Sequence, residues 1–205
     1  MNSTYLFIKG LADTLAAAIL LVLLSWLFLL VGLLYLLTGE RSLFFRQERL
    51  GRNEKAFTLY KFRTLKANEH LPLDKRKFTL GSFLRYLSLD ELPQLWNILK
   101  GEMSLVGPRP LPVTYQPLFS AEQRKRFTVK PGITGWAQVN GRHGIPWERK
   151  FELDNWYVDH QSFRVDLRII FKTIVLLLSF KKDISLEEEP FQGSTDPSTL
   201  TPDPQ

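Results

Sequence analysis

The chain has 205 residues, of which 27 are lysine or arginine and 21 are aspartate or glutamate, giving a formal net charge of +6 at pH 7. It contains no cysteine, which excludes disulfides, thiolate metal sites and cysteine nucleophiles. No lysine or arginine follows Lys182, whereas six acidic residues do. A nucleic-acid-binding protein would also be basic, but the sequence has neither a recognition motif nor regularly alternating basic and aromatic residues, so no nucleic-acid partner is expected.

Residues 14–39 form an apolar segment without any charged side chain. As a helix it would be about 39 Å long, whereas the hydrocarbon core of a bilayer is about 30 Å thick. A secretory signal has a shorter apolar core and a small-residue cleavage site, but here Glu40 and Arg41 follow. A buried helix of a soluble protein would have a polar face. The sequence therefore predicts an N-terminal membrane helix within residues 1–40.

The segment after this helix is rich in positive charge. Its basic residues, opposed only by Glu48 and Glu54, are Arg41, Arg46, Arg49, Arg52, Lys55, Lys61, Arg63 and Lys66. Such a cluster beside a membrane helix marks the cytoplasmic side, where each charge near an anionic leaflet contributes about 1 kcal/mol. We therefore expect residues 41–182 to form one domain on the cytoplasmic face.

This domain begins with a predicted hairpin. Residues 42–65 contain two short aromatic and β-branched runs joined around Gly51 and Asn53, a pattern typical of two antiparallel strands. Residues 78–87 then have apolar side chains at helical spacing, on a face suited to lipid or to the core. The first part of the domain is therefore expected to be a hairpin followed by a helix.

Further along, local signals predict short elements and one longer helix. Ser120 and Gln123 have the spacing of a helix-capping box. The glycine-rich residues 130–146 favour turns and short extended pieces over helix. Pro146 suits the first turn of a helix, and apolar residues recur at helical spacing after it.

The last predicted helix, residues 165–180, is apolar but interrupted by Arg168 and Lys172, so its uncharged run is too short to span a bilayer. It is expected to lie on the membrane or to pack in the core. Residues 183–205 contain four prolines and no basic residue, which predicts a disordered acidic tail. Together the elements predict a mostly helical α+β fold, with a membrane helix, a small hairpin and interfacial helices around a site.

Asp90 and Glu91 are adjacent acids within this basic domain. On a helix, neighbouring side chains point about 100° apart, so these carboxylates cannot flank one bond and need different partners. A helix that starts near Asp90 keeps Pro93 in its first turn, where the missing N–H matters least. Both acids then lie at the positive end of the helix dipole, which would lower their pKa and keep them ionised. Helix capping alone is the ordinary role of such acids.

Several cations point to a phosphate-rich ligand. Pro108 and Pro110 restrict the backbone on both sides of Arg109, whose planar guanidinium suits phosphate oxygens. Any one of the other cations could be solvated surface charge, but together they favour phosphate binding. They are Lys61, Arg63, Arg85 and Arg142.

Five segments resemble, in order and spacing, the bacterial sugar transferase family of polyprenyl-phosphate phosphoglycosyl transferases. They are FFRQERLGRN, YKFRTL, SLDELPQLWNILKGEMSLVGPRP, KPGITGWAQVNGR and VDLRIIFKT. The resemblance covers residues 5–182, and the chain is similar to the small, monotopic form of the family. It implies an enzyme of the bacterial cytoplasmic membrane with its catalytic domain on the cytoplasmic face.

The resemblance also implies the chemistry. A sugar 1-phosphate would pass from a UDP-sugar to a polyprenyl (undecaprenyl) phosphate with Mg²⁺ and release of UMP, as the first membrane step of bacterial glycoconjugate assembly. Asp90 would be the nucleophile that forms a covalent phosphosugar intermediate, and Glu91 would support the metal or proton transfers, so both are candidate metal ligands. Other positions that match the family's motifs are Lys61, Arg85, Arg109, Arg142 and Asp166. The alternative is an inactive membrane scaffold that binds sugar nucleotide or lipid phosphate, against which the intact acid pair argues.

The membrane helix departs from the family pattern in its middle. Family members commonly have Ser-Pro there, where proline breaks the helix so that it enters and leaves by the same face, whereas this chain has Ser25-Trp26. Ser25 can still bend the helix by bonding back to the carbonyl of Leu21. Both a re-entrant and a spanning helix therefore remain open. The sequence does not identify the UDP-sugar or the glycan pathway, and it is compatible with a homo-oligomer.

Overall fold

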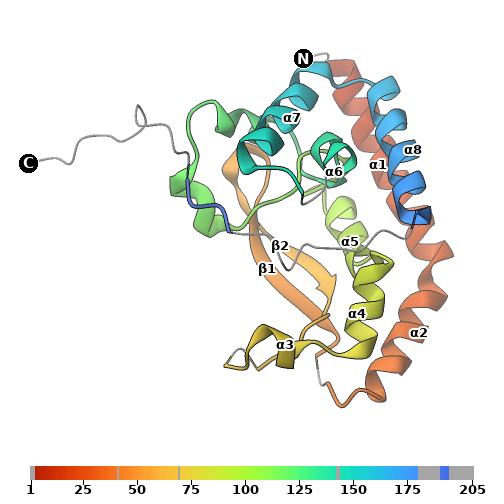
Figure 1. Ribbon diagram of the computed structural model, residues 1–205. Helices are drawn as coiled ribbons and strands as arrows, with labels where there is room; N and C mark the ends of the chain where they lie inside the picture. Colours follow the sequence, from red (N-terminus) through yellow and green to blue (C-terminus); the bar gives the residue numbers. More distant parts are fainter. Residues whose placement is uncertain (1–2, 41, 69, 142–143, 180–189, 194–205) are drawn as a thin grey trace, which may run out of the picture.

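The computed structural model describes residues 3–40, 42–68, 70–141, 144–179 and 190–193. Helices predominate in these residues and the strands form two small sheets, so the predicted mostly helical α+β fold is confirmed (Figure 1). The helices are α1 (Ser3–Leu23), α2 (Ser25–Leu36), α3 (Leu73–Arg76), α4 (Thr79–Tyr86), α5 (Gln94–Leu99), α6 (Trp136–Asn140), α7 (Trp147–His160) and α8 (Phe163–Leu178). The strands are β1 (Phe44–Leu50), β2 (Ala56–Phe62), β3 (Ser104–Val106) and β4 (Gly132–Thr134). Four 3₁₀ turns are η1 (Arg52–Glu54), η2 (Leu89–Glu91), η3 (Val113–Leu118) and η4 (Gln123–Thr128).

The predicted hairpin is present as β1 and β2, which pair antiparallel with Phe44 opposite Phe62. Between the strands Asn53 has a φ of 56°, a left-handed conformation that asparagine adopts more readily than most residues. One face of β2 packs against α1 and α5 in a shared apolar cluster. The hairpin is therefore fixed to the membrane helix and to the helix that follows the acid pair.

The second sheet comes from the glycine-rich part of the chain, where the prediction was only partly right. The expected extended piece is β4, which pairs in parallel with β3. Gly107 must be glycine there, because a Cβ would lie 2.4 Å from the carbonyl oxygen of Lys130. Residues 136–140, however, form helix α6 rather than a turn. Trp136 stacks on Trp156 of α7 at 4.6 Å, a tertiary contact that outweighs the helix-breaking glycines on either side.

Local capping signals were more reliable. The Ser120 N–H donates to Gln123 Oε1 at 2.9 Å and the Gln123 N–H donates to Ser120 Oγ at 3.3 Å, so the capping box is confirmed, although it opens a 3₁₀ turn. Helix α7 begins immediately after Pro146, as predicted. Helix α8 combines both expected roles, because Ile169 is fully buried while other apolar residues on it are exposed.

The apolar N-terminal segment is two helices rather than one. Helix α1 starts well before residue 14 and ends at Leu23, and α2 starts at Ser25, with a change of direction between them (Figure 1). Ser25 Oγ donates to the carbonyl of Val22 at 2.8 Å, one residue closer than the predicted partner Leu21. In the described residues one helix, over Thr4–Leu23, is long and apolar enough to cross a membrane.

Two charged side chains on α1 are buried against the rest of the chain. Lys9 Nζ lies 2.9 Å from Asp166 Oδ2 on α8 and 3.4 Å from Asp13 Oδ2. Asp13 Oδ2 in turn accepts a hydrogen bond from Ser104 Oγ of β3. Asp166 also accepts hydrogen bonds from two tyrosine hydroxyls, so each carboxylate has several partners. These polar contacts attach the first half of α1 to β3 and α8.

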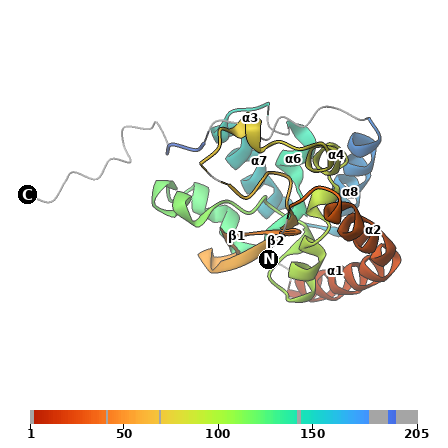
Figure 2. The ribbon, with the colours of Figure 1, turned by 90° about the horizontal axis from the view of Figure 1, so that it is seen from below.

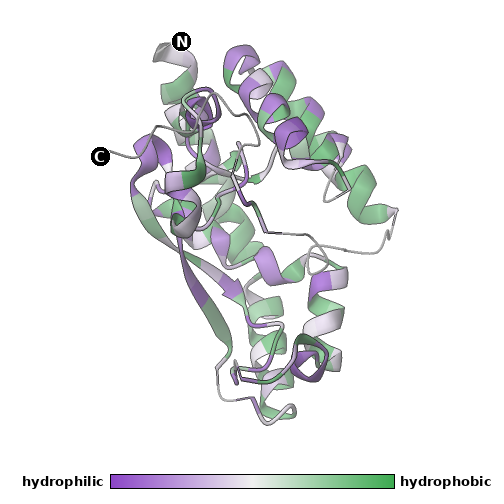
Figure 3. Cartoon of the chain, turned by 60° about the vertical axis from the view of Figure 1, so that its left-hand side comes forward, coloured by the Kyte–Doolittle hydropathy of each residue, from purple (hydrophilic) through white to green (hydrophobic). Residues whose placement is uncertain are grey.

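Helix α2 is attached by apolar contacts instead, since Val31 and Tyr35 pack in a cluster with β2 and α4. The opposite side of α2 packs against nothing in the described residues, and Leu29 and Leu36 are 77% and 79% exposed. Helix α8 lies beside α1 (Figures 1 and 2) and likewise exposes Phe171, and its last turns are coloured as hydrophobic in Figure 3. Apolar surface this extensive on three helices indicates association with a membrane.

Part of the predicted disordered tail is placed against the domain. Of residues 183–205 the structure describes 190–193, in which Phe191 is 3% exposed and packs in an aromatic cluster with η3 and α7. Burial of this ring was not anticipated from the composition of the tail. The rest of the tail lies outside the described residues.

The burial of Lys9 generates a prediction about stability. Lys9→Met removes one partner of an ion pair whose side chains are 11% and 9% exposed, leaving the Asp166 charge without its cation. We expect the free energy of unfolding to fall by about 3–5 kcal/mol, the usual cost of breaking a buried pair. Thermal and denaturant unfolding of the detergent-solubilised protein, followed by circular dichroism, measures this change.

The matched control is Lys77→Met, because Lys77 pairs with Asp74 at 3.1 Å on the surface, with side chains 43% and 90% exposed. Its effect should stay within about 1 kcal/mol. Adding Asp166→Asn to Lys9→Met should restore part of the loss, since the unpaired charge of Asp166 is then removed and Asp13 keeps its hydrogen bond from Ser104. Equal effects of Lys9→Met and Lys77→Met would show that the Lys9–Asp166 ion pair contributes no more to stability than a surface pair.

Candidate active site

A cavity of about 820 Å³ lies between the hairpin, the turn after α4, the loop after β3, and helices α6 and α7. Parts of α1 and α8 close it on one side. Five of the predicted site residues line this cavity, although they come from four separate parts of the chain. They are Lys61, Arg85, Asp90, Glu91 and Arg109.

The acid pair is positioned by a tight turn. Ser88 has a φ of 56°, which reverses the chain after α4 and directs it into η2. Asp90 and Glu91 belong to η2, and α5 begins after Pro93. The predicted helix therefore starts later than Asp90, because α5 begins at Gln94 and Pro93 is its N-cap, where a missing N–H is tolerated.

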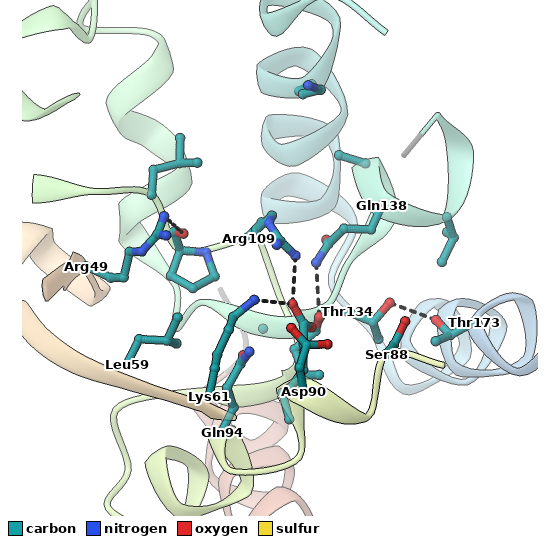
Figure 4. A pocket seen from close by; sticks show the side chains of 18 of the residues that line it. Arg49, Leu59, Lys61, Ser88, Asp90, Gln94, Arg109, Thr134, Gln138 and Thr173 are labelled. Carbon is teal, nitrogen blue, oxygen red and sulfur yellow. Dashed lines mark hydrogen bonds and ion pairs between the residues drawn. The ribbon is translucent and has the colours of Figure 1, made fainter. Parts of the chain in front are cut away.

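Glu91 forms ion pairs with two cationic side chains. Lys61 Nζ of β2 lies 2.5 Å from Glu91 Oε1, and Arg109 Nη1 lies 3.3 Å from the same oxygen. Figure 4 shows Lys61 and Arg109 approaching this carboxylate from two sides, with Asp90 next to it. The structure therefore brings residues 61, 91 and 109 together in the cavity that Asp90 also lines.

The distance between Lys61 and the acid pair is maintained by Asn97 of α5, which is completely buried. Its amide nitrogen donates to the carbonyl of Thr58 at 2.7 Å, and its amide oxygen accepts from the N–H of Tyr60 at 3.2 Å. Both partners belong to β2, whose outer edge would otherwise have unpaired backbone groups. One side chain thus fixes the register of β2 against α5, with Lys61 next to the bonded residues.

The loop that carries Arg109 is held by the second sheet and by a buried ion pair. The Gly107 N–H donates to the carbonyl of Thr134 at 2.9 Å. Arg126 Nη2 donates to the carbonyl of Arg109 at 2.6 Å and lies 2.8 Å from Asp154 Oδ2. The side chains of Arg126 and Asp154 are 3% and 4% exposed, so this support is rigid and shielded from water.

The two acids differ in their pKa. Burial raises the pKa of Asp90, against the opposing effect of Lys61. Burial acts in the same direction on Glu91, but Lys61 and Arg109 outweigh it and lower the pKa of that carboxyl. The prediction of a lowered pKa is therefore confirmed for Glu91 and wrong for Asp90. A three-residue turn has little helix dipole, so burial and neighbouring charges decide.

Four charged residues line the cavity that sequence reasoning did not assign to it, namely Arg49, Arg126, Lys150 and Asp154. Arg49 was interpreted as a membrane-surface charge, but its Nη1 donates to the carbonyl of Pro110 at 3.2 Å. Burial and the nearby Arg109 lower the pKa of Arg49 to about 10. Arg126 and Asp154 lie on different elements, and no local pattern could have indicated that they pair.

Among the described residues, two predicted site residues, Arg63 and Asp166, are not among those that line the cavity. Arg63 is half-buried, with its guanidinium carbon 5.8 Å from the centre of the Phe45 ring. Asp166 lies in the buried polar cluster with Lys9, where it attaches α1 rather than facing the cavity. Arg142 lies outside the described residues.

The acid pair could supply two carboxylate ligands to a magnesium ion, with the substrate and water supplying the others. The described residues contain no group of three or more histidine, cysteine, aspartate or glutamate side chains that could form a complete metal site. Mg²⁺ usually binds through one or two carboxylates, with substrate phosphates and water supplying the other ligands. Asp90 and Glu91 are adjacent carboxylates in a cavity lined with cations, which is the donor set such a site requires.

Comparison with known proteins identifies the family. The family model described as bacterial sugar transferase matches residues 4–180. This chain belongs to the bacterial sugar transferases. It is 46% identical to the uncharacterized sugar transferase EpsL of Bacillus subtilis, over 95% of this chain and all of that protein.

Longer relatives have more specific names. The UDP-N-acetylgalactosamine-undecaprenyl-phosphate N-acetylgalactosaminephosphotransferase of Aeromonas hydrophila is 38% identical over 85% of this chain and 44% of that protein. The UDP-glucose:undecaprenyl-phosphate glucose-1-phosphate transferase of Escherichia coli is 37% identical over 82% of this chain and 39% of that protein. The chain spans less than half the length of these two relatives.

The ion pairs of Glu91 generate a prediction about titration. In the ligand-free protein Asp90 should take up a proton at higher pH than Glu91, because the cations hold the charge on Glu91. Lys61→Met should raise the pKa of Glu91 by about 1–3 pH units, the usual effect of losing an adjacent opposite charge. Carbon-13 NMR of labelled carboxyl groups measures both titrations. Lys77→Met serves as a distant control, and protonation of Glu91 before Asp90 in the unmodified protein would contradict the assignment.

Proposed function

We propose that this transferase moves a sugar 1-phosphate from a UDP-sugar to a polyprenyl phosphate and releases UMP. The observation that carries the proposal is the convergence of Asp90 and Glu91 with Lys61, Arg85 and Arg109 in one cavity. A diphosphate carries several negative charges, which cations lining the same cavity can neutralise. The relatives from Aeromonas hydrophila and Escherichia coli are named for transfer of a sugar phosphate to undecaprenyl phosphate, which supports the same substrates here.

The proposed reaction has two displacements at one phosphorus. First, a carboxylate oxygen of Asp90 forms a bond to the β-phosphorus, the bond from that phosphorus to the bridging oxygen breaks, and its electron pair leaves on UMP. Then a phosphate oxygen of the lipid attacks the same phosphorus, and the Asp90 carboxylate is released. Asp90 must be ionised to attack, so its environment needs positive charge when substrate is bound.

Glu91 has a supporting role in this scheme. Its carboxylate holds Lys61 and Arg109 on the side of the cavity where Asp90 lies, so the cations are oriented before substrate arrives. Asp90 and Glu91 would also hold Mg²⁺, which when bound neutralises charge on the diphosphate. The planar guanidinium of Arg109 would bind phosphate oxygens from its fixed loop.

The lipid acceptor is expected to enter from the side of α1 and α8. Leu20 and Leu24 of the membrane helices and Leu176 and Leu177 of α8 line the same cavity as the acid pair. An apolar wall suits the first isoprene units of a polyprenyl chain, while its phosphate meets the cations. The site would then act at headgroup depth without extracting the lipid from the bilayer.

We also infer that the membrane helices are re-entrant, with the domain on the cytoplasmic face. The first half of α1 contacts α8 through Lys9, and the end of α2 contacts β2 and α4 through Tyr35. Both ends of the helix pair therefore touch the same domain. A spanning arrangement would place Lys9 and Asp13 towards lipid or carry α1 away from these contacts, at a high cost in charge burial.

The first test of function is a search for the covalent intermediate. A panel of UDP-sugars with undecaprenyl phosphate first identifies the donor. That donor and Mg²⁺ without lipid should then release UMP in a burst of at most about one equivalent per active site. Asp90→Asn keeps the shape of the side chain but not its charge, and should abolish both the burst and the phosphosugar adduct seen by mass spectrometry.

Further results distinguish the covalent mechanism from its alternatives. Glu91→Gln should slow turnover yet leave adduct detectable, because Glu91 forms no bond to the substrate. An adduct on the Asp90→Asn protein, or release of UMP only when lipid is present, would contradict the covalent aspartyl mechanism. A folded protein that binds UMP but releases none from any UDP-sugar would instead favour the inactive scaffold.

The topology is tested by labelling. The native chain has no cysteine, so Asn2→Cys introduces a single thiol at the N-terminus. In intact cells a membrane-impermeant maleimide should not modify it, and permeabilised cells should show modification. Lys77→Cys, on an exposed part of the domain, is the matched control and should behave identically. Modification of residue 2 alone in intact cells would show that the helix spans the membrane.

A further inference from the structure

One wall of the cavity is aromatic. Tyr115 of η3 and Trp147 and Phe151 of α7 line it, together with Pro190 from the C-terminal segment. Its residues come from η3, α7 and the C-terminal segment, whereas the leucine wall comes from the membrane helices and α8. It is therefore distinct from the apolar leucine wall assigned above to the lipid.

Phe191 packs behind this wall and is in ring contact with all three of its aromatic residues. Its ring centre lies 5.8 Å from that of Tyr115, 5.6 Å from Trp147 and 5.1 Å from Phe151. It also stacks on Phe119 at 5.5 Å. With 3% exposure it is a core residue of the cluster, although it lies beyond residues 4–180, which match the family model.

Phe191 is the residue that attaches the C-terminal segment to the domain. Pro190 and Gln192 are exposed, so the ring is the buried attachment of this segment. Gly193 has a φ of 103°, a conformation that favours glycine, and lies against Leu118 of η3. The segment thus places the Phe191 ring in the aromatic cluster, and Pro190 lines the cavity.

The chemistry of the walls indicates which part of a UDP-sugar each would hold. The hydroxyls of Thr134 and Thr173 and the amide of Gln138 line the cavity on the side opposite Arg49, as Figure 4 shows, and suit sugar hydroxyls. Tyr115 lies on the Arg49 side, because its N–H donates to the carbonyl of Pro112 at 3.0 Å and Pro112 forms an isolated antiparallel bridge with Arg49. Flat bases stack on aromatic side chains, and a neighbouring guanidinium suits the phosphate of a nucleotide.

We propose that Phe191 is a positioning residue for the nucleoside of the donor: by packing behind Tyr115, Trp147 and Phe151 it holds the aromatic wall in the orientation that receives the uracil ring. This inference rests on the proposed function, since it assigns a subsite within the same cavity. Phe191 does not itself line the cavity, so it should affect nucleotide affinity and not the chemical step.

The test compares Phe191→Ala with the unmodified full-length protein. Calorimetric titration with UMP and Mg²⁺ should show a Kd about tenfold higher for Phe191→Ala, equivalent to about 1.4 kcal/mol. The KM for the UDP-sugar should rise by the same factor, while kcat changes by less than about twofold and the KM for undecaprenyl phosphate is unchanged. Phe191→Leu, which keeps apolar volume without the ring, should fall between the two proteins.

The matched control is Gln192→Ala, which alters the exposed neighbour and should bind UMP as the unmodified protein does. Thermal unfolding identifies any variant that has not folded. If Phe191→Ala is one, Phe191→Leu decides alone: weaker UMP binding at unchanged kcat supports the inference, and unchanged UMP binding overturns it.

Other outcomes are equally decisive. A raised KM for the UDP-sugar with unchanged UMP affinity would assign the aromatic wall to the sugar, and a raised KM for the lipid would assign it to the acceptor. Either result, or a fall in kcat alone, overturns the inference. A protein that turns over normally with equal UMP affinity in all variants refutes the role of Phe191 but not the proposed function. A protein whose UMP affinity depends on Phe191 but that forms no intermediate refutes the mechanism and not the subsite.

Discussion

The carboxylate of Glu91 is where three distant parts of the chain meet. Lys61 reaches it from the hairpin and Arg109 from the loop after β3, and each is held by its own buried support, Asn97 for the hairpin and Arg126 for the loop. A buried carboxylate without such partners would be costly. Because Glu91 takes both cations, the adjacent Asp90 is left with burial as the largest influence on its pKa. Two neighbouring acids therefore acquire different properties from their surroundings, as division of labour in an active site requires.

Helix α1 connects the site to the membrane. Helix α1 carries charges on one side and bare leucines on the other, so a single helix can pack on the domain and still face lipid. Its break at Leu24 needs no proline, since Ser25 bonds back to the preceding turn. Leu20 before this break and Leu24 at the break line the cavity that contains the acid pair. The apolar wall proposed for the lipid and the charged residues proposed for the phosphates therefore lie in the same cavity.

Elements with strong local signals were predicted well. The hairpin around Asn53, the capping box at Ser120 and the start of α7 after Pro146 depend on residues within a few positions of one another, and all three are confirmed. Where local signals were weak, prediction failed: α6 forms among glycines because Trp136 stacks on a distant tryptophan. The pKa of Asp90 was assigned the wrong direction for the same reason, since burial is a property of the folded chain.

The sequence by itself determined the apolar segment, the basic domain that follows it, the order of the main elements and the motifs that single out Asp90, Glu91 and Arg109. Periodicity, turn chemistry and net charge are readable over short stretches of chain, which is why these features could be predicted. Only the tertiary structure decided that Asp166 attaches α1, that Arg126 pairs with Asp154, and that Phe191 packs behind the cavity. Each of these contacts joins residues far apart in the chain, and burial selects such partners by complementary charge and shape, for which a single sequence contains no local pattern.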